Sequence, residues 1–191
     1  MRRIILSALA VALLSGCQPP KMTMAELFAT PAVPAEMARL ERFVGTWSGT
    51  AEMVSPTAAE MNEMIVDGTV PESFNGGEQY KWVLDGQFLM GEGWHEMPNG
   101  ERANYIMFWK WDDKAKKYRT WYFGSMGDWG KGSAKFKGDD TMRMKAEGHG
   151  PKGHMRGKGT MTFVSDDQVD WKWQEGNLFF QMKMKGTSTK Q

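Results

Sequence analysis

The sequence predicts an all-β fold: a single antiparallel up-and-down β-barrel of about ten strands with a short N-terminal helix. Apolar and polar residues alternate with a period of two in successive segments after residue 45. Turn-forming Gly, Asp and Asn residues separate most of these segments, and 191 residues suit one domain. Strands joined in this way close economically into a barrel, because closure removes exposed edges. A flat sandwich is the alternative.

The N-terminus carries a targeting segment. Arg2 and Arg3 precede an apolar run from Ile4 to Leu14, which is shorter than the roughly 20 residues needed to span a bilayer. We therefore interpret residues 1–16 as a signal peptide. The segment Leu14-Ser15-Gly16-Cys17 resembles the lipobox of bacterial lipoproteins. The resemblance implies cleavage before Cys17 and attachment of acyl chains such as palmitate. The alternative is an ordinary signal peptide with an idle thiol at Cys17.

An acylated Cys17 makes the lipid bilayer the first expected partner, because each buried acyl CH₂ contributes about 0.8 kcal/mol. Residues 17–34 are then the lipidated Cys and a proline-punctuated tether. We expect a lipid-anchored protein of the cell envelope. In well-studied Gram-negative bacteria an Asp directly after the lipidated Cys favours the inner membrane. Residue 18 of this chain is Gln, so we expect the outer membrane or periplasmic face. A net charge of only +1 argues against nucleic acid as a partner.

The folded domain is expected over residues 35–191. A helix is predicted over residues 35–44, because Met37, Leu40, Phe43 and Val44 follow an i, i+3, i+6, i+7 spacing that gives one apolar face. Residues 55–77 are interpreted as a loop over one mouth of the barrel. Strands are predicted over residues 46–54, 78–84, 87–97, 102–111, 117–124, 129–137, 142–147, 155–163, 169–174 and 178–185.

Three motifs carry a family resemblance. A short helix runs into Gly45-Thr46-Trp47-Ser48-Gly49, and later come Leu84-Asp85-Gly86-Gln87-Phe88-Leu89 and the aromatic segment from Trp109 to Trp121. This ordered set is similar to domain-of-unknown-function family 1579, a set of bacterial lipocalin-like barrels, over residues 36–188. The chain has Lys110-Trp111-Asp112 where the family usually has Gly-Tyr-Asp. The resemblance implies a barrel of about ten strands without a settled activity, and it implies that Trp47 is a structural plug of the closed end.

Catalytic and metal chemistry find little support in the sequence. No Gly-x-Ser-x-Gly, His-Glu-x-x-His, P-loop or dinucleotide motif occurs, so we do not expect an enzyme. Glu92 and Glu96 share a face, which we interpret as an outward acidic stripe rather than a catalytic pair. His95 is interpreted as facing outward or lining a pocket. No cofactor is therefore expected.

Two cofactors, haem and Cu(I), are the alternatives that particular residues suggest. A haem ligand would need a strand histidine, but His149 and His154 flank a predicted hairpin loop. Paired methionines such as Met142 and Met144 would suit Cu(I), because soft sulfur suits a soft ion. They fall on the apolar face of predicted strands, where Met is an ordinary packing residue. We therefore expect neither haem nor metal.

We expect the barrel to bind a small, mostly apolar ligand, because its predicted inner face mixes large apolar side chains with Gly157 and Gly159. The alternation leaves the orientation of the strands in the first half of the chain open. The alternative is a structural or protein-interaction module with a filled barrel and an exposed aromatic patch from Trp109, Trp111, Trp121 or Trp129. The candidate ligand-binding residues are Trp82, Trp94, Trp109, Trp121, Met144, Met161, Trp171 and Phe180.

Overall fold

The computed structural model describes residues 29, 31–54, 73–97, 100–150, 153–177 and 181–191. It divides into two units, residues 1–32 and 33–191. In the first unit only residues 29, 31 and 32 are described, so the predicted signal peptide, Cys17 and most of the tether lie outside the described residues. The same holds for residues 55–72 of the predicted loop. Within the described ranges, no helix is long and apolar enough to cross a membrane.

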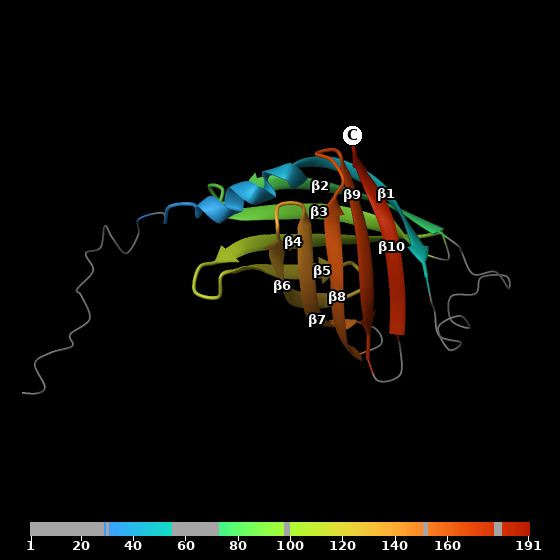
Figure 1. Cartoon of the computed structure of the whole chain (residues 1–191). Coiled ribbons are helices and arrows are strands. Elements are labelled where there is room, and N and C mark those ends of the chain that lie inside the picture. The colour runs from blue at the N-terminus through green and yellow to red at the C-terminus, as the bar shows by residue number, and fades with distance from the viewer. Residues whose placement is uncertain (1–28, 30, 55–72, 98–99, 151–152, 178–180) are drawn as a thin grey trace, which may run out of the picture. The chain divides into compact units, whose positions relative to one another are not determined.

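The second unit is a closed antiparallel barrel, which confirms the predicted fold class (Figure 1). Each strand pairs with its neighbours in sequence, and the first strand also pairs with the last. The elements are η1 (Ala35–Phe43), β1 (Gly45–Met53), β2 (Ser73–Val83), β3 (Phe88–Glu96), β4 (Arg102–Asp112), β5 (Lys117–Gly124), β6 (Trp129–Lys137), β7 (Thr141–Gly150), β8 (Gly153–Phe163), β9 (Gln168–Gly176) and β10 (Gln181–Lys190).

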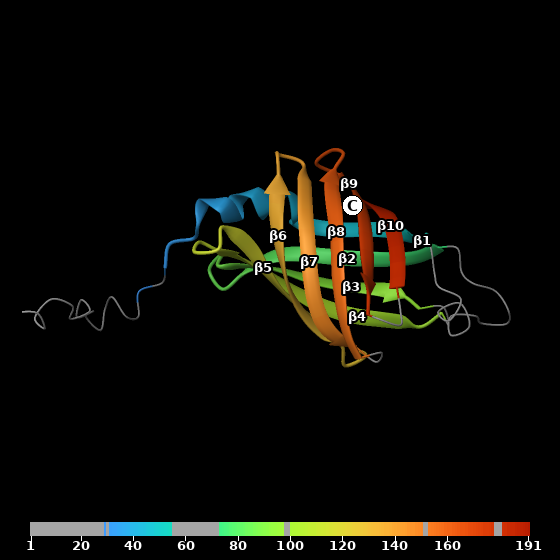
Figure 2. The ribbon, with the colours of Figure 1, turned by 60° about the horizontal axis from the view of Figure 1, so that its bottom comes forward.

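Closure depends on β1, which has a partner on both sides. Trp47 lies opposite Lys190 on β10, and Gly45 lies opposite Tyr80 on β2. Figure 2 shows how β6, β7 and β8 continue the wall side by side. None of the ten described strands therefore has a free edge, which rules out the flat sandwich.

The N-terminal helix is a 3₁₀-helix of nine residues. Its buried side chains, Met37, Leu40 and Phe43, are spaced by three and are at most 3% exposed. That spacing matches the three residues per turn of a 3₁₀-helix, in which positions i and i+3 eclipse. Because 3₁₀ segments of this length are uncommon, packing of this face against the barrel holds the helix in shape.

One end of the barrel is sealed by η1. The Phe43 ring lies 5.6 Å from Tyr80, 5.9 Å from Trp109 and 5.0 Å from Phe163, measured between ring centroids. Each fully buried apolar side chain of this kind contributes about 1.5–3 kcal/mol. The core at this sealed end consists of Met37, Leu40, Phe43, Trp47, Tyr80, Leu89, Trp109, Tyr118, Ala134, Met142, Phe163 and Val169.

The start of β2 corrects one prediction. Gly76 and Gly77 were interpreted as the end of the long loop, but both lie inside the strand, and Gly76 pairs with Gly49. A Cβ atom on Gly77 would lie 2.8 Å from Nε1 of Trp94, so this position accepts only glycine without a shift of the indole. Gly77 therefore provides room for an aromatic ring on the outer wall, and neither glycine forms a turn.

Candidate ligand-binding site

The strand register decides which residues face the lumen. Trp47, Glu78, Gly93 and Tyr105 are successive cross-strand partners on β1 to β4. Cross-strand partners point to the same side of a sheet, and Trp47 is 3% exposed in the sealed core. All four positions therefore face inward, and alternate residues along each strand follow.

The interior has two unlike halves. At the sealed end a buried core lies between η1 and the strands, and Trp82, Trp111 and Phe136 are only partly buried beside it. Towards the opposite end every large inward-facing side chain that the structure describes keeps part of its surface accessible. We call this second region the open half. Solvent therefore reaches into the lumen there. Its inward-facing, partly accessible residues include Met53, Phe74, Glu78, His95, Tyr105, Tyr122, Met155, Trp171, Trp173, Glu175, Met182 and Met184.

Five of the eight predicted ligand-binding residues face inward: Trp82, Trp109, Met144, Met161 and Trp171. The first four pack in or against the sealed core rather than in the open half. The Trp82 indole N–H donates to Oε2 of Glu41 at 2.6 Å, beside η1. Only Trp171 is among the residues of the open half, and the last candidate, Phe180, lies outside the described residues.

Two candidates, Trp94 and Trp121, face outward, which corrects their predicted orientation. The Arg102 guanidinium lies 3.8 Å from the centroid of the Trp94 ring on the outer wall. Trp121 lies 6.3 Å from the outward-facing Phe88 ring. Aromatic side chains occupy both faces of β3, β4 and β5, so hydrophobicity alone does not distinguish inside from outside there.

The inward-facing glycines of β8 hold aromatic rings and do not leave empty space. A Cβ on Gly157 would lie 2.2 Å from Cζ2 of Trp173, and a Cβ on Gly159 would lie 2.5 Å from Cε3 of the same ring. A Cβ on Gly186 would likewise lie 2.5 Å from Cζ2 of Trp171. Because they rest on glycine, these indoles lie against the wall. This arrangement places large aromatic surfaces on the inner wall of the barrel.

The half-buried Glu78 carboxyl group is the centre of a polar cluster inside the barrel. The Tyr80 hydroxyl donates to its Oε2 at 2.9 Å, and the Tyr105 hydroxyl donates to its Oε1. Burial raises the pKa of Glu78 above its ordinary value, although both hydrogen bonds act in the opposite direction. Burial and the nearby Glu78 also raise the pKa of Tyr105, so its hydroxyl remains a donor.

A second carboxyl group, Glu175, lies in the open half. It accepts a hydrogen bond of 2.8 Å from Nε1 of Trp173. Burial raises its pKa, and the charge of Asp128 raises it further. Burial and Asp128 also raise the pKa of the Tyr122 hydroxyl, whereas burial lowers the pKa of His95. The lumen thus offers hydrogen-bond acceptors among aromatic rings.

The sequence interpretation missed both interior carboxylates. Glu78 has the same parity as Tyr80 on β2, and Glu175 has the same parity as Trp171 and Trp173 on β9. Each is a charged residue at an apolar position of the alternation, and that break was the available signal. Glu92 lies on the outer wall as interpreted, where Lys81 Nζ pairs with it at 3.3 Å. The described residues contain no group of three or more His, Cys, Asp and Glu that could hold a metal ion.

A known family matches most of the barrel. Residues 33–177 match the family described as "Protein of unknown function (DUF1579)". The chain belongs to the DUF1579 family. Residues 1–18 match the prokaryotic membrane lipoprotein lipid attachment site, so this DUF1579 chain carries the attachment signal of a lipid-anchored membrane protein. No curated protein matches it.

Solved structures similar to this DUF1579 chain include a phycobiliprotein lyase and redesigned β-barrels. The S-type phycobiliprotein lyase CPES from Guillardia theta has a TM-score of 0.54 and 10% identity, over 83% of this chain and 93% of the lyase. A redesigned β-barrel, mFAP1 bound to DFHBI, has a TM-score of 0.42 and 16% identity, over 80% of this chain and 98% of that one. At such low identity the lyase supports the fold alone.

Proposed function

We propose that this DUF1579 lipoprotein binds a small, mostly apolar ligand in the open half of its barrel, without catalysing a reaction. The supporting observation is that large inward-facing side chains of this half keep accessible surface inside a closed barrel. Trp171, Trp173 and Met182 supply an apolar lining, and Met adapts to irregular shapes. Pockets of this composition are typical of small-ligand sites.

The ligand has one polar end that donates hydrogen bonds or carries a positive charge. The polar groups of the lumen include the carboxyls of Glu78, Asp128 and Glu175, which accept hydrogen bonds. A carboxylate in a low-dielectric lumen is costly unless it is paired. A donor or cation on the ligand would satisfy such a group, whereas an anionic ligand would meet repulsion.

Native mass spectrometry of the protein extracted from its own cells tests this proposal. We expect the wild-type protein to carry an added mass beyond that of the chain and its acyl groups, and we expect this mass to be lost when the protein is denatured. Met182→Trp puts a larger ring into the lumen and should abolish the added mass. Lys183→Trp is the matched control, because the neighbouring side chain faces outward on the same strand. Binding in the lumen is refuted if the wild-type protein carries no added mass, or if Met182→Trp retains it.

The second candidate function is a non-catalytic interaction module with a filled barrel. It draws support from Ile106, Phe123 and Trp129, which are 40%, 47% and 49% exposed and are cross-strand neighbours on β4 to β6. An apolar patch on an outer wall is a feature of proteins that dock on other surfaces. A ligand detected in the lumen would contradict the filled barrel.

We also infer that the barrel is held at the outer membrane or periplasmic face through acyl chains on Cys17. The lipid attachment match over residues 1–18 supports the anchor. Gln18 in place of Asp supports this choice of face.

A further inference from the structure

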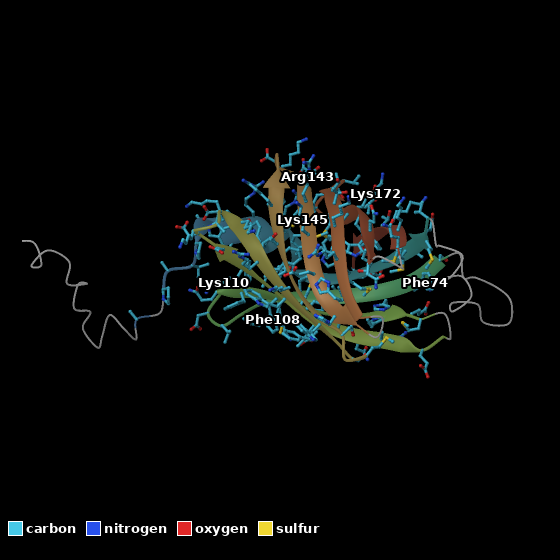
Figure 3. All side chains as sticks on the ribbon, turned by 90° about the horizontal axis from the view of Figure 1, so that it is seen from below. Phe74, Phe108, Lys110, Arg143, Lys145 and Lys172 are labelled. Atoms are coloured by element: carbon cyan, nitrogen blue, oxygen red, sulfur yellow. The ribbon has the colours of Figure 1, made fainter. Side chains whose placement is uncertain are left out.

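The outer wall of β6 to β10 is strongly basic, although the whole chain is nearly neutral. Only two carboxylates, Glu147 and Asp170, occupy outward positions of these described strands. Figure 3 shows Arg143, Lys145 and Lys172 over this part of the molecule. We call this surface the basic wall. Its ten cationic residues are Lys131, Lys135, Lys137, Arg143, Lys145, Arg156, Lys158, Lys172, Lys183 and Lys185.

Like charges stand directly opposite one another on the basic wall. The cross-strand partners are Lys135 with Arg143, Lys145 with Lys158, and Lys172 with Lys185. Such pairs destabilise a sheet. Of the ten cations only Lys131 and Lys185 form an ion pair with a carboxylate of the described residues. The wall therefore lacks the anions that would compensate its charge.

The basic wall is also hollowed. Two hollows of about 1500 and 790 Å³ overlap it and share residues such as Lys145 and Lys158. The larger one extends onto β4 and β5 and has four carboxylates in its lining. The smaller hollow has no carboxylate in its lining. It is lined by nine cations: Lys116, Lys117, Lys135, Arg143, Lys145, Lys158, Lys172, Lys183 and Lys185. A phosphate group seated there would meet only cations and neutral groups.

An exposed apolar row borders the basic wall. Ile106, Phe123 and Trp129 form this row, and Trp129 continues across the sheet to His149, with ring centroids 5.3 Å apart. Trp129 precedes Lys131 on the outer face of the same strand. Exposed Trp and Phe beside cations are typical of proteins that lie at a membrane interface. A soluble polyanion would leave this apolar row uncovered.

We propose that the basic wall docks on the anionic lipid headgroups of the membrane to which the chain is anchored. The match to a lipid attachment site points to a membrane nearby. Residues 18–32 extend to at most about 50 Å, so the barrel remains within reach of the surface. Basic residues add electrostatic attraction to an acyl anchor, and the two signals together make membrane attachment stable.

Site-specific fluorescence on the acylated protein tests the docking. Because Cys17 is the single cysteine and is blocked by acylation, a cysteine introduced at Thr160 takes up one fluorophore in the middle of the basic wall. The matched label replaces Gln79, which faces outward on β2. The protein is reconstituted in phosphatidylcholine vesicles with or without phosphatidylglycerol, and a quencher is attached to the lipid headgroups.

We expect quenching at position 160 only in the vesicles that contain phosphatidylglycerol, and its loss at high salt. In these vesicles position 79 should be quenched less than position 160. Equal quenching at both positions in the vesicles that contain phosphatidylglycerol, or equal quenching at position 160 with and without anionic lipid, would overturn the proposal. Neither outcome bears on the ligand in the lumen, which the mass measurement tests separately.

Charge-reversal variants test whether the cations of the basic wall cause the docking. We expect quenching at position 160 to be abolished by the combined change Lys135→Glu, Lys145→Glu and Lys172→Glu. This variant should fold, because each new Glu lies opposite a remaining cation on the neighbouring strand. The control combines Lys81→Glu, Arg102→Glu and Lys114→Glu outside the wall and should retain quenching. Retained quenching in the first variant contradicts the proposal. So does a label at position 160 that responds to inorganic polyphosphate but not to vesicles, because the occupant is then a soluble polyanion.

Discussion

At the scale of single residues, the contact between Trp173 and the glycines beneath it gives the sharpest prediction. Gly157→Ala places a Cβ where the Trp173 ring now lies, so the indole must move into the lumen. We expect a loss of about 1–3 kcal/mol in the free energy of unfolding. Gly150→Ala is the control, because its Cβ would meet nothing closer than 3.4 Å. Urea unfolding followed by tryptophan fluorescence measures both, and equal stabilities would show that the ring is not held by this contact.

Glu175 predicts a pH dependence of stability. Its pKa is raised by burial above the ordinary 4.5, so its contribution to stability is complete below pH 4.5 and is lost as the pH rises through the raised pKa. Glu175→Gln keeps an acceptor for the Trp173 N–H but cannot ionise. We expect the variant to be more stable than the wild type at neutral pH, and this advantage to vanish near pH 4. Urea unfolding measures the two free energies of unfolding. A difference between the variant and the wild type that stays constant from pH 4 to neutral pH would contradict the ionisation of a buried Glu175.

Which side chains face the lumen could be predicted only in part from the sequence. Alternation placed Met144, Met161 and Trp171 on the inner face without ambiguity, because charged residues occupy every neighbouring outward position except Thr160 and Thr162. In β3 to β5 the same argument fails, since aromatic residues such as Trp121 lie outside. Phe88 and Trp121 meet on the outer wall, a contact that needs the register of three strands to be known.

At the scale of elements, η1 acts as the seal of one barrel end. Leu40 is fully buried between this helix and the strands. We expect Leu40→Ala to lower the free energy of unfolding by about 2–5 kcal/mol, because it removes buried apolar surface and leaves a cavity. Ala38→Ser changes an exposed position of the same helix and should have little effect. Thermal unfolding of the two variants tests whether η1 is part of the core.

The pairing of β7 with β8 predicts a gain in stability from one charge reversal. Lys145 stands opposite Lys158, so Lys145→Glu replaces a repulsive pair by an attractive one. We expect an increase of about 0.2–1 kcal/mol in the free energy of unfolding, reduced by salt. Lys183→Glu is the control, because its partner on β9 is the neutral Gln174. A gain that is equal in both variants would show that the repulsion between Lys145 and Lys158 is negligible.

Most elements could be predicted closely because charge and hydrophobicity alternate in the last strands and because turn-forming residues separate the earlier ones. The strands Lys117–Gly124 and Trp129–Lys137 match their predicted limits. The start of β2 could not be predicted, because Gly76 and Gly77 carry a local turn signal that the tertiary contact with Trp94 overrides. The helix was predicted by its apolar face, and its 3₁₀ geometry follows from a spacing of three that the sequence already contains.

At the scale of the whole molecule, a small net charge conceals a strong separation of charge. The formal charge of the chain is +1, yet cations gather on the basic wall while Glu78 and Glu175 lie inside the barrel. Composition alone could not show this. The excess of positive charge appears only when the outward positions of β6 to β10 are known from the structure.

The lipid anchor gives the prediction for the molecule as a whole. Cys17→Ser removes the sulfur that the acyl chains require, so we expect the protein to leave the membrane fraction. Ser15→Ala keeps a small residue before the cysteine and should stay in the membrane fraction. Fractionation followed by mass measurement of the N-terminal peptide tests both. A Cys17→Ser protein that remains in the membrane fraction through high-salt washing would contradict the anchor.

The ladder between β1 and β10 has a consequence for how the molecule is made. Trp47 pairs with Lys190, so the second edge of β1 stays uncovered until β10 has been made. Until then a growing chain exposes unpaired edges on an incomplete sheet, which are templates for aggregation. Contacts of such long sequence separation also fold slowly. A truncation of only the last strand therefore removes the closure itself and leaves two open edges in place of a barrel.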